Sequence, residues 1–373
     1  MKKNILILYT NYGTGHYIAA KGIEEYLKHN YSNYNVILFD PLSYSRPLIN
    51  KIFAKTGQIV ATRFRKFRGK LYNNQMYRNY LKTPWYFNLF TKLFWNKLIE
   101  KKLTEFNPDI IISTQVGPTG LITSHKDLFK SKLIAVFTDY GVHRMYTITH
   151  NNIDMYCVPD KKIKKHLIDI GINKDKIKVT GIPVRNQIIT QENKCTKEEI
   201  IIKYHLLRNK PIILFICGGG LGYDNAFVYF KKLLESKYQF SYIFISGKNK
   251  KLYKKATKLA SKYKKKGQIL GYVEKISDLI RNSDLIIGKP GGIVTTESLN
   301  LGIPLCAIEP IPGQENYNAL FISENKFGFY ITNLKEFEIL LDDLKNNIID
   351  LEEYKLNINK KFYKFSFIDL EKI

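Results

Sequence analysis

The residues best suited to chemistry lie in the stretch 284–329 of this 373-residue chain. A short apolar run, 285–287, is followed by a glycine turn over 288–292, and a helix is predicted to open at Thr295. Glycine lets backbone N–H groups approach a ligand closely, and the free N–H groups and dipole of a helix start favour phosphate. Glu297, in the first turns of that helix, could bind two vicinal ribose hydroxyls. The groups predicted to hold a ligand here are Lys289, Gly291, Gly292, Thr295 and Glu297.

A second strand, predicted over 303–308, leads into a loop that carries Gln314 and Glu315. In open parallel sheets, ligands bind outside the carboxyl ends of the strands. An amide and a carboxylate at that position are suited to sugar hydroxyls. Taken alone, Gln314 and Glu315 would be interpreted as a solvated loop and Glu297 as a surface residue of its helix. Their occurrence at successive strand ends favours a nucleotide-sugar site.

A third turn is rich in glycine. The buried strand predicted over 212–217 ends in Gly218, Gly219 and Gly220. Consecutive glycines at a strand end permit close approach of the backbone to phosphate or sugar. The three turns together predict a site for a sugar diphosphate.

The residues 271–330 resemble the donor-binding domain of the family-28 glycosyltransferases, in the branch of diacylglycerol glucosyltransferases and monogalactosyldiacylglycerol synthases. The matching strings are GYVEKISDLIRNSDLIIGKPGG, TTESLNLGIP and PIPGQENYNA. The resemblance implies an α/β GT-B fold, with two Rossmann-like domains whose parallel sheets face an interdomain cleft. It also implies that the glycines 218–220 close over the diphosphate, that Val273 holds uracil through its main chain, and that Arg185, after the VTGIP string, is a candidate for the diphosphate.

Two residues of the first half are candidates for a general base. His16 follows the glycine-containing loop TNYGTG, and Asp139 follows a strand predicted over 133–137. An isolated histidine at a helix start is normally structural, and Asp139 could cap a turn. The resemblance implies that both face the acceptor and that the anomeric carbon is inverted, so a base must deprotonate the acceptor hydroxyl in one displacement. His16 is the first candidate and Asp139 the second.

Strands alternate with helices along the chain, which predicts parallel sheets. We expect an acceptor and membrane-docking domain over 1–185 and a UDP-sugar donor domain over 186–350. A C-terminal helix over 351–373 is expected to cross back to the first domain. The lysine-rich helix predicted over 248–266 is most simply a solvated face.

The segment 62–103 differs from the rest of the chain. It carries eleven Lys and Arg residues against one acid, Glu100, together with both tryptophans, Trp85 and Trp95. Basic charge with aromatic residues is typical of a helix that lies in a membrane surface, where each Lys or Arg adds about 1 kcal/mol. The alternative is a core-packed helix pair with solvated lysines. No RRM, KH or OB pattern accompanies the basic residues, so we expect no nucleic acid.

Composition narrows the class of protein further. The net charge of +26 implies an anionic partner. No apolar run approaches the length that spans a bilayer, and the N-terminal apolar run is too short for a signal peptide. The four cysteines are scattered, which indicates a reducing compartment. We therefore expect a cytoplasmic protein, peripheral on the inner face of the cell membrane.

The predicted function is inverting transfer of a hexose, glucose or galactose, from a UDP-sugar to diacylglycerol or glycosyl-diacylglycerol. The chain has no D-x-D triplet. We therefore expect no cofactor and no essential metal, with glycine turns and helix N-termini stabilising the leaving UDP. The alternatives are a polyprenyl-linked acceptor, a UDP-sugar 2-epimerase, and a membrane-associated sensor that binds UDP-sugar without catalysis.

Overall fold

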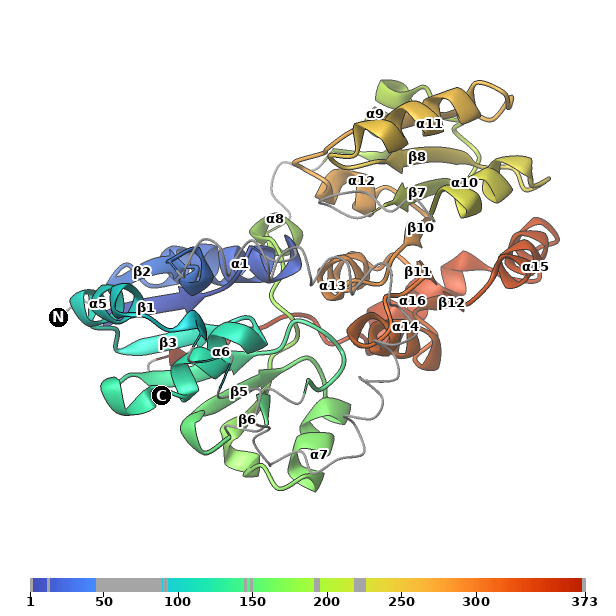
Figure 1. The fold of residues 1–373 in the computed structure, drawn as a ribbon. Coiled ribbons are helices and arrows are strands. Elements are labelled where there is room, and N and C mark those ends of the chain that lie inside the picture. The colour runs from blue at the N-terminus through green and yellow to red at the C-terminus, as the bar shows by residue number, and fades with distance from the viewer. Residues whose placement is uncertain are drawn as a thin grey trace. The chain divides into compact units, whose positions relative to one another are not determined.

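The computed structural model describes residues 3–11, 14–44, 89, 91, 93–143, 146–147, 150–190, 195–217 and 226–370. The chain forms two compact units. The first comprises Met1–Asn186, Pro312–Gln314 and Tyr363–Ile373, and the second comprises Gln187–Ile311 and Glu315–Phe362. Each unit contains one parallel six-stranded sheet covered by helices on both faces (Figure 1). The predicted α/β class with two parallel sheets is confirmed.

The first unit is built on a sheet of strand order β2-β1-β3-β4-β5-β6. Its strands are β1 Lys3–Leu8, β2 Tyr34–Phe39, β3 Ile110–Ser113, β4 Lys132–Val136, β5 Met155–Val158 and β6 Ile177–Val179. Its α-helices are α1 Thr14–Asn30, α5 Lys97–Phe106, α6 Val116–Thr123 and α7 Lys161–Asp169, and α8 Asn186–Ile189 follows at the boundary. Short 3-10 turns occupy η1 Pro41–Tyr44, η2 Lys126–Leu128, η4 His150–Asn152 and η5 Lys174–Lys176.

Alternation of side chains along the central strands creates two cores in this unit. One face of β1, with Leu6 and Leu8, packs with residues of α5, α6 and α7. The other face, with Ile5 and Ile7, packs with α1 and with residues of the C-terminal segment after 362. The sheet is therefore apolar on both faces, and only its strand ends can carry a polar site.

The second unit repeats this plan with strand order β12-β11-β10-β7-β8-β9. Its strands are β7 Ile212–Ile216, β8 Ser241–Ile245, β9 Gly267–Leu270, β10 Leu285–Gly288, β11 Leu305–Ile308 and β12 Gly328–Ile331. Its helices are α9 Lys197–Tyr204, α10 Ala226–Glu235, α11 Lys250–Ala260, α12 Ser277–Arg281, α13 Gly292–Asn300, α14 Gln314–Glu324, α15 Leu334–Lys345 and α16 Leu351–Lys361.

The helices of the second unit form two layers. α10, α11 and α15 share one core with the sheet, in which Phe215 and Phe244 are fully buried. α9, α12, α13, α14 and α16 share the opposite core with Leu214 and Ile243. Side-chain caps define several helix starts. At α9, for example, Thr196 and Glu199 form a reciprocal capping box.

The end of the chain divides between the units. The prediction placed a helix over 351–373 against the first domain. In the structure, α16 ends at Lys361 and Ile358 packs in the core of the second unit. Phe365 and Phe367 follow as chain outside any helix and pack in the core of the first unit.

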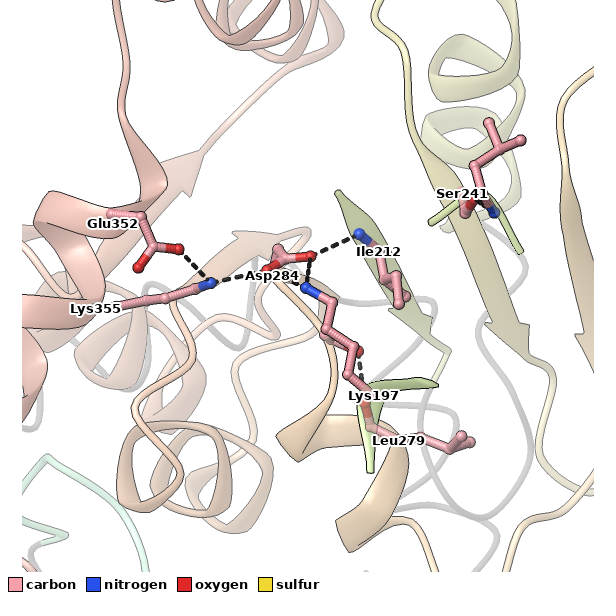
Figure 2. Close-up of polar contacts among 9 residues, drawn as sticks. Lys197, Ile212, Ser241, Leu279, Asp284, Glu352 and Lys355 are labelled. Atoms are coloured by element: carbon pink, nitrogen blue, oxygen red, sulfur yellow. Dashed lines mark hydrogen bonds and ion pairs between the residues drawn. The ribbon is translucent and has the colours of Figure 1, made fainter. Parts of the chain in front are cut away.

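A cluster of charged side chains anchors β10 at its start (Figure 2). Asp284 accepts hydrogen bonds from Lys197 Nζ at 2.9 Å, from Lys355 Nζ at 2.8 Å and from the Ile212 N–H at 2.8 Å. Glu352 in turn accepts from Lys355 Nζ at 2.7 Å. The cluster therefore ties α9, α16 and β7 to the strand that ends in the glycine turn.

Asp284→Asn is expected to lower the free energy of unfolding by about 2–3 kcal/mol, because it removes the negative charge that Lys197 and Lys355 share and leaves the partly buried Lys355 with Glu352 alone. Burial would raise the pKa of Asp284, but the hydrogen bonds from Lys355 and Ile212 outweigh it and hold the pKa below its ordinary value. The folded-state pKa thus lies below the unfolded one, so the stabilisation is present at neutral pH and is lost as the pH falls through the folded pKa. Urea unfolding at pH 7 and under acid checks this: an equal difference at both pH values would contradict it.

Most of the basic segment 62–103 lies outside the described residues, and the described part begins at Leu89. Phe94 is buried against Leu42 and Leu121. Trp95 does not lie on an exposed face: its ring stacks on His125 with the centroids 3.8 Å apart. Leu89, at 50% exposure, and Leu98, at 48%, are accessible. Among the described residues, no helix is long and apolar enough to cross a membrane.

Candidate functional site

The topology of the second sheet marks one point at its edge as the place for a ligand. From β7 the chain adds β8 and β9 on one side, and from β10 it adds β11 and β12 on the other. The connections after β7 and β10 therefore diverge, and open α/β sheets bind ligands in such a crevice at the carboxyl ends of the strands. The turn after β10 comprises residues 289–291, within the predicted glycine turn 288–292. The glycines 218–220 after β7 lie outside the described residues.

The helix that follows β10 has an open N-terminus. α13 begins at Gly292, three residues before the predicted start at Thr295, and its N-cap Gly291 provides no side-chain hydrogen bond. A Cβ added to Gly291 would meet no heavy atom within 4 Å, so there is space beside the first turn. The first N–H groups of a helix have no intrahelical partner. Together with the dipole they make this end of α13 suited to an anion.

Two polar residues of α13 lie inside the unit rather than on its surface. Thr295 is fully buried, and its hydroxyl has no hydrogen-bond partner among the described residues. Glu297 is only 1% exposed, which excludes the interpretation of this residue as a solvated helix position. A carboxylate costs free energy to bury, so its presence near the open helix start favours a role in binding.

Gly288 shows why β10 must end in glycine. A Cβ at this position would lie 2.5 Å from the carbonyl oxygen of Ile216 on β7. Only glycine allows the two strands to pair closely up to the point where they diverge. The two loops of the predicted site therefore start side by side.

Two polar contacts join the loop after β10 to the segment after β11, and a third lies within that second segment. Lys289 Nζ lies 3.4 Å from Glu315 Oε1, and the other oxygen of Glu315 accepts from the Ile311 N–H at 2.6 Å. The buried side chain of Asn318 donates to the Pro290 carbonyl at 2.8 Å. Gln314 and Glu315 open α14 and do not form a loop. The structure thus brings Lys289 and Glu315 together.

Two further predicted residues come from other elements. Val273 follows β9, two strands away from β7, and packs partly against the core of the second unit. Arg185 belongs to the first unit, between β6 and α8, and is partly buried. Asn318 is a residue of this group that was not predicted from the sequence. It falls four residues after Gln314, on the same helix face, which could have been a signal.

The first sheet has the same kind of switch, between β1 and β3, and His16 lies there. From β1 the chain adds β2 on one side, and from β3 it continues to β6 on the other. His16 is the third residue of α1, which follows β1. Its Nδ1 lies 3.0 Å from the carbonyl oxygen of Thr114, just after β3, and 2.9 Å from Thr138 Oγ1, just after β4. Three strand ends therefore hold this ring.

The contact with the Thr114 carbonyl indicates the tautomer of His16. A carbonyl oxygen can only accept a hydrogen bond, so Nδ1 carries the proton and donates to Thr114. Nε2 is then the nitrogen with a free lone pair. Burial lowers the pKa of His16 to about 4, although the Thr114 hydrogen bond opposes the change. The ring is consequently neutral at pH 7 and can accept a proton at Nε2.

Asp139 is the next residue after Thr138, which contacts the His16 ring. It is partly buried and lies near the hydroxyl of Tyr146, whose pKa is raised first by burial and then by the charge of Asp139. Thr114 and Thr138, the two partners of His16, were not identified from the sequence. Thr114 directly follows β3 and Thr138 lies two residues beyond β4, and this position is the only local signal they carry.

No group of three or more His, Cys, Asp or Glu side chains in the described parts of the chain is arranged to hold a metal ion. The four cysteines, at positions 157, 195, 217 and 306, are all free thiols.

Comparison with known proteins identifies relatives over nearly the whole chain. Residues 16–184 match the monogalactosyldiacylglycerol (MGDG) synthase model, and residues 213–368 match the glycosyltransferase family 28 C-terminal domain. The chain is 31% identical to a processive diacylglycerol β-glucosyltransferase of Bacillus licheniformis, over 97% of this chain and 90% of that protein. It is 32% identical to the protein of the same name from Bacillus pumilus, over 98% and 92%.

Solved structures share the fold at much lower identity. MurG of Acinetobacter baumannii aligns with a TM-score of 0.64 and 13% identity, over 96% of this chain and 95% of that one. The UDP-GlcNAc 2-epimerase of Neisseria meningitidis, bound to UDP-GlcNAc, aligns with a TM-score of 0.60 and 15% identity, over 95% and 94%. These likenesses establish the two-domain fold that glycosyltransferases share with epimerases.

Proposed function

This chain belongs to the family-28 glycosyltransferases of the diacylglycerol type, and from that premise we propose how its two units carry out the transfer. It is a UDP-sugar-dependent hexosyltransferase that acts on diacylglycerol. The single observation that carries this function is the match to diacylglycerol glucosyltransferases over 97% of the chain. The polar residues at the switch point of each sheet supply the chemistry.

The second unit binds the donor at the carboxyl edge of its sheet. The open N-terminus of α13 binds the diphosphate. Its uncapped N–H groups and the space beside Gly291 favour this placement. Glu297 binds the ribose hydroxyls, and Gln314 and Glu315 bind the hexose. The contacts of Glu315 with Ile311 and Lys289 fix its orientation and leave further lone pairs of the carboxylate for sugar hydroxyls.

The remaining donor contacts follow from the family pattern. The glycines 218–220 close over the diphosphate, the main chain of Val273 holds the uracil, and Arg185 contributes positive charge to the diphosphate. The donor sugar is glucose or galactose. The acceptor is diacylglycerol or a diacylglycerol that already carries a sugar.

The first unit supplies the base. His16 Nε2 accepts the proton of the acceptor hydroxyl as that oxygen attacks the anomeric carbon, and UDP departs from the opposite face. Thr114 and Thr138 hold the ring in the tautomer that this step requires. Asp139, beside Thr138, is the second candidate for the base. A single displacement of this kind inverts the anomeric centre and gives a β-glycoside.

We expect the transfer to need no metal, because backbone N–H groups at the start of α13 and nearby cationic side chains can stabilise the leaving diphosphate. Turnover in excess EDTA should equal turnover in buffer, and added Mg²⁺ or Mn²⁺ should not raise it beyond an ionic-strength effect. The release of UDP at matched ionic strength measures this. A loss of activity in EDTA that Mg²⁺ restores would contradict it.

The enzyme works at the inner face of the cell membrane as a peripheral protein, with the segment 62–103 on the anionic bilayer surface. The sequence pattern of that segment and the exposed leucines at its described end support this placement. Neither the fold nor the proposed mechanism calls for a nucleic acid.

The test is incubation of the pure protein with UDP-glucose or UDP-galactose and diacylglycerol dispersed in neutral detergent micelles. We expect a glycosyl-diacylglycerol, and its mass identifies the sugar, the number of sugars and the acceptor. A polyprenyl glycoside in a parallel reaction, with no diacylglycerol product, would favour the lipid-carrier alternative. Conversion of the donor alone would favour the epimerase alternative, which shares only the fold.

A further inference from the structure

The outer face of α11 carries a dense positive charge that the proposed donor and base chemistry does not use. The segment 248–266 contains ten lysines, and no acidic residue occurs between Glu235 and Glu274. All but one of these lysines are exposed. None of the ten forms an ion pair with an acid in the described residues. Lys248 lies over the Tyr272 ring, 5.2 Å from its centroid, and Lys265 contacts the Tyr238 carbonyl and the Phe240 ring.

The helix is fixed in place by its other face. Leu252 and Ala256 are fully buried in the core that α11 shares with the sheet. The side chain of Asn249 caps the start of the helix by accepting from the Leu252 N–H at 2.9 Å. Five of the lysines, at positions 250, 251, 254, 255 and 258, therefore belong to a helix that is fixed on the sheet, and the other five flank it (Figure 1). They form a fixed array, in which Tyr253 is also 40% exposed.

Other helices of the same unit show that this array is not simply the lysine-rich composition of the chain. α9, α10, α15 and α16 all carry lysine, and each also carries acidic residues. Two ion pairs within these helices illustrate the mixture: Lys231 lies 3.5 Å from Glu235, and Lys355 lies 2.7 Å from Glu352. Of the lysine-bearing helices described in the second unit, α11 is the one that has no acid.

We propose that the exposed face of α11 is a second membrane-docking surface, which holds the donor unit against anionic phospholipid headgroups. The inference rests on the proposed function, because a lipid acceptor is what brings the enzyme to a bilayer. A row of lysines on a flat helix suits a surface of many weakly ordered phosphates, since an ammonium group binds phosphate as a point charge without fixed geometry. The array contains no arginine, the residue that supplies bidentate contacts to nucleic acids.

The test compares two variants of the full chain with equal loss of charge. The first neutralises α11 with K251Q, K254Q, K255Q and K258Q. The control neutralises exposed lysines of α15 and α16 with K335Q, K345Q, K360Q and K361Q. Co-sedimentation with phosphatidylcholine vesicles, with and without phosphatidylglycerol, is measured over a range of NaCl concentrations, and thermal unfolding shows that both variants are folded.

We expect the α11 variant to bind vesicles that contain phosphatidylglycerol at least about tenfold more weakly than wild type. The affinity of the control variant should change by no more than about twofold. Binding by the α11 variant equal to that of the control would overturn the inference. So would tight binding of wild-type protein to single-stranded RNA that depends on the α11 lysines, with no such dependence for vesicles. Transfer to diacylglycerol in neutral micelles should be the same in all three proteins; a wild-type failure there counts against the proposed function, whereas the vesicle comparison judges α11.

Discussion

His16→Ala should lower the turnover number by about two orders of magnitude or more, with little change in the affinity for UDP. A positioned general base typically contributes a factor of about 10² to 10⁴. The ring lies in the first unit, with its partners Thr114 and Thr138, whereas the proposed diphosphate site belongs to the second. Single-turnover kinetics with saturating UDP-sugar measures the chemical step, and calorimetry with UDP measures the affinity.

His29, which is exposed at the end of the same helix, offers a matched control, and His29→Ala should leave both quantities unchanged. Thr138→Val gives an intermediate case, because it removes one contact of His16 Nδ1 and retains the carbonyl of Thr114. A His16→Ala enzyme that turns over like wild type would remove this residue from the mechanism. In that event Asp139 would be the next base to examine.

The pH profile follows from the pKa of His16. Burial holds that pKa at about 4, so Nε2 is unprotonated from mildly acidic pH upward. The acid limb of kcat/KM should therefore have its midpoint well below the ordinary value of about 6.5 for histidine. Unfolding must be measured in parallel, because the unfolded chain binds this proton more readily, so the folded state loses stability as the pH falls from about 6.5 toward 4. A midpoint near 6.5 in a fully folded enzyme would exclude His16 as the titrating base.

The second large effect is expected at Glu297. Glu297→Gln keeps the size of the side chain but removes its charge, and it replaces one acceptor oxygen with a donor. Hydrogen bonds to a charged group are worth about 1.5–3 kcal/mol, so the affinity for UDP should fall between about tenfold and a hundredfold. Calorimetric titrations of UDP and of inorganic pyrophosphate should be compared. A loss of affinity for UDP but not for pyrophosphate would locate the effect in the nucleoside part.

Glu353, exposed in the first turn of α16, is the control for charge, and Glu353→Gln should bind UDP as wild type does. Because Glu297 is only 1% exposed, thermal unfolding must accompany the titration. Wild-type affinity for UDP in a folded Glu297→Gln protein would show that this carboxylate has no part in binding ribose.

Local pattern was sufficient for β10 and for most of the donor turn, whereas β12 was not predicted. The apolar run 285–287 is β10, and the glycines after it open the switch point of the second sheet. The helix start was placed three residues late, and Ile293 and Val294, which the prediction left out of the helix, are β-branched and have low helix propensity. Burial of α13 in the core overrides that propensity.

What the sequence did not reveal is the set of contacts between residues that are distant along the chain. His16 is held by partners 98 and 122 residues away, and Asp284 by partners 71 to 87 residues away. The periodicity of apolar residues along a segment cannot predict these contacts, because they depend on the order of the strands in the sheet. Trp95 shows the same limit, since it stacks on a histidine from the segment after α6 rather than lying exposed beside the basic run.

The most direct measurement of the central claim is one proton NMR time course of UDP-glucose or UDP-galactose with the enzyme, recorded with and without dispersed diacylglycerol. With the acceptor, the account predicts that each UDP released is matched by one β-linked hexose on lipid. Without it, the donor signals should persist unchanged over the same period. An α-linked product, or a donor consumed equally fast in the absence of lipid, would contradict a single displacement by the acceptor hydroxyl.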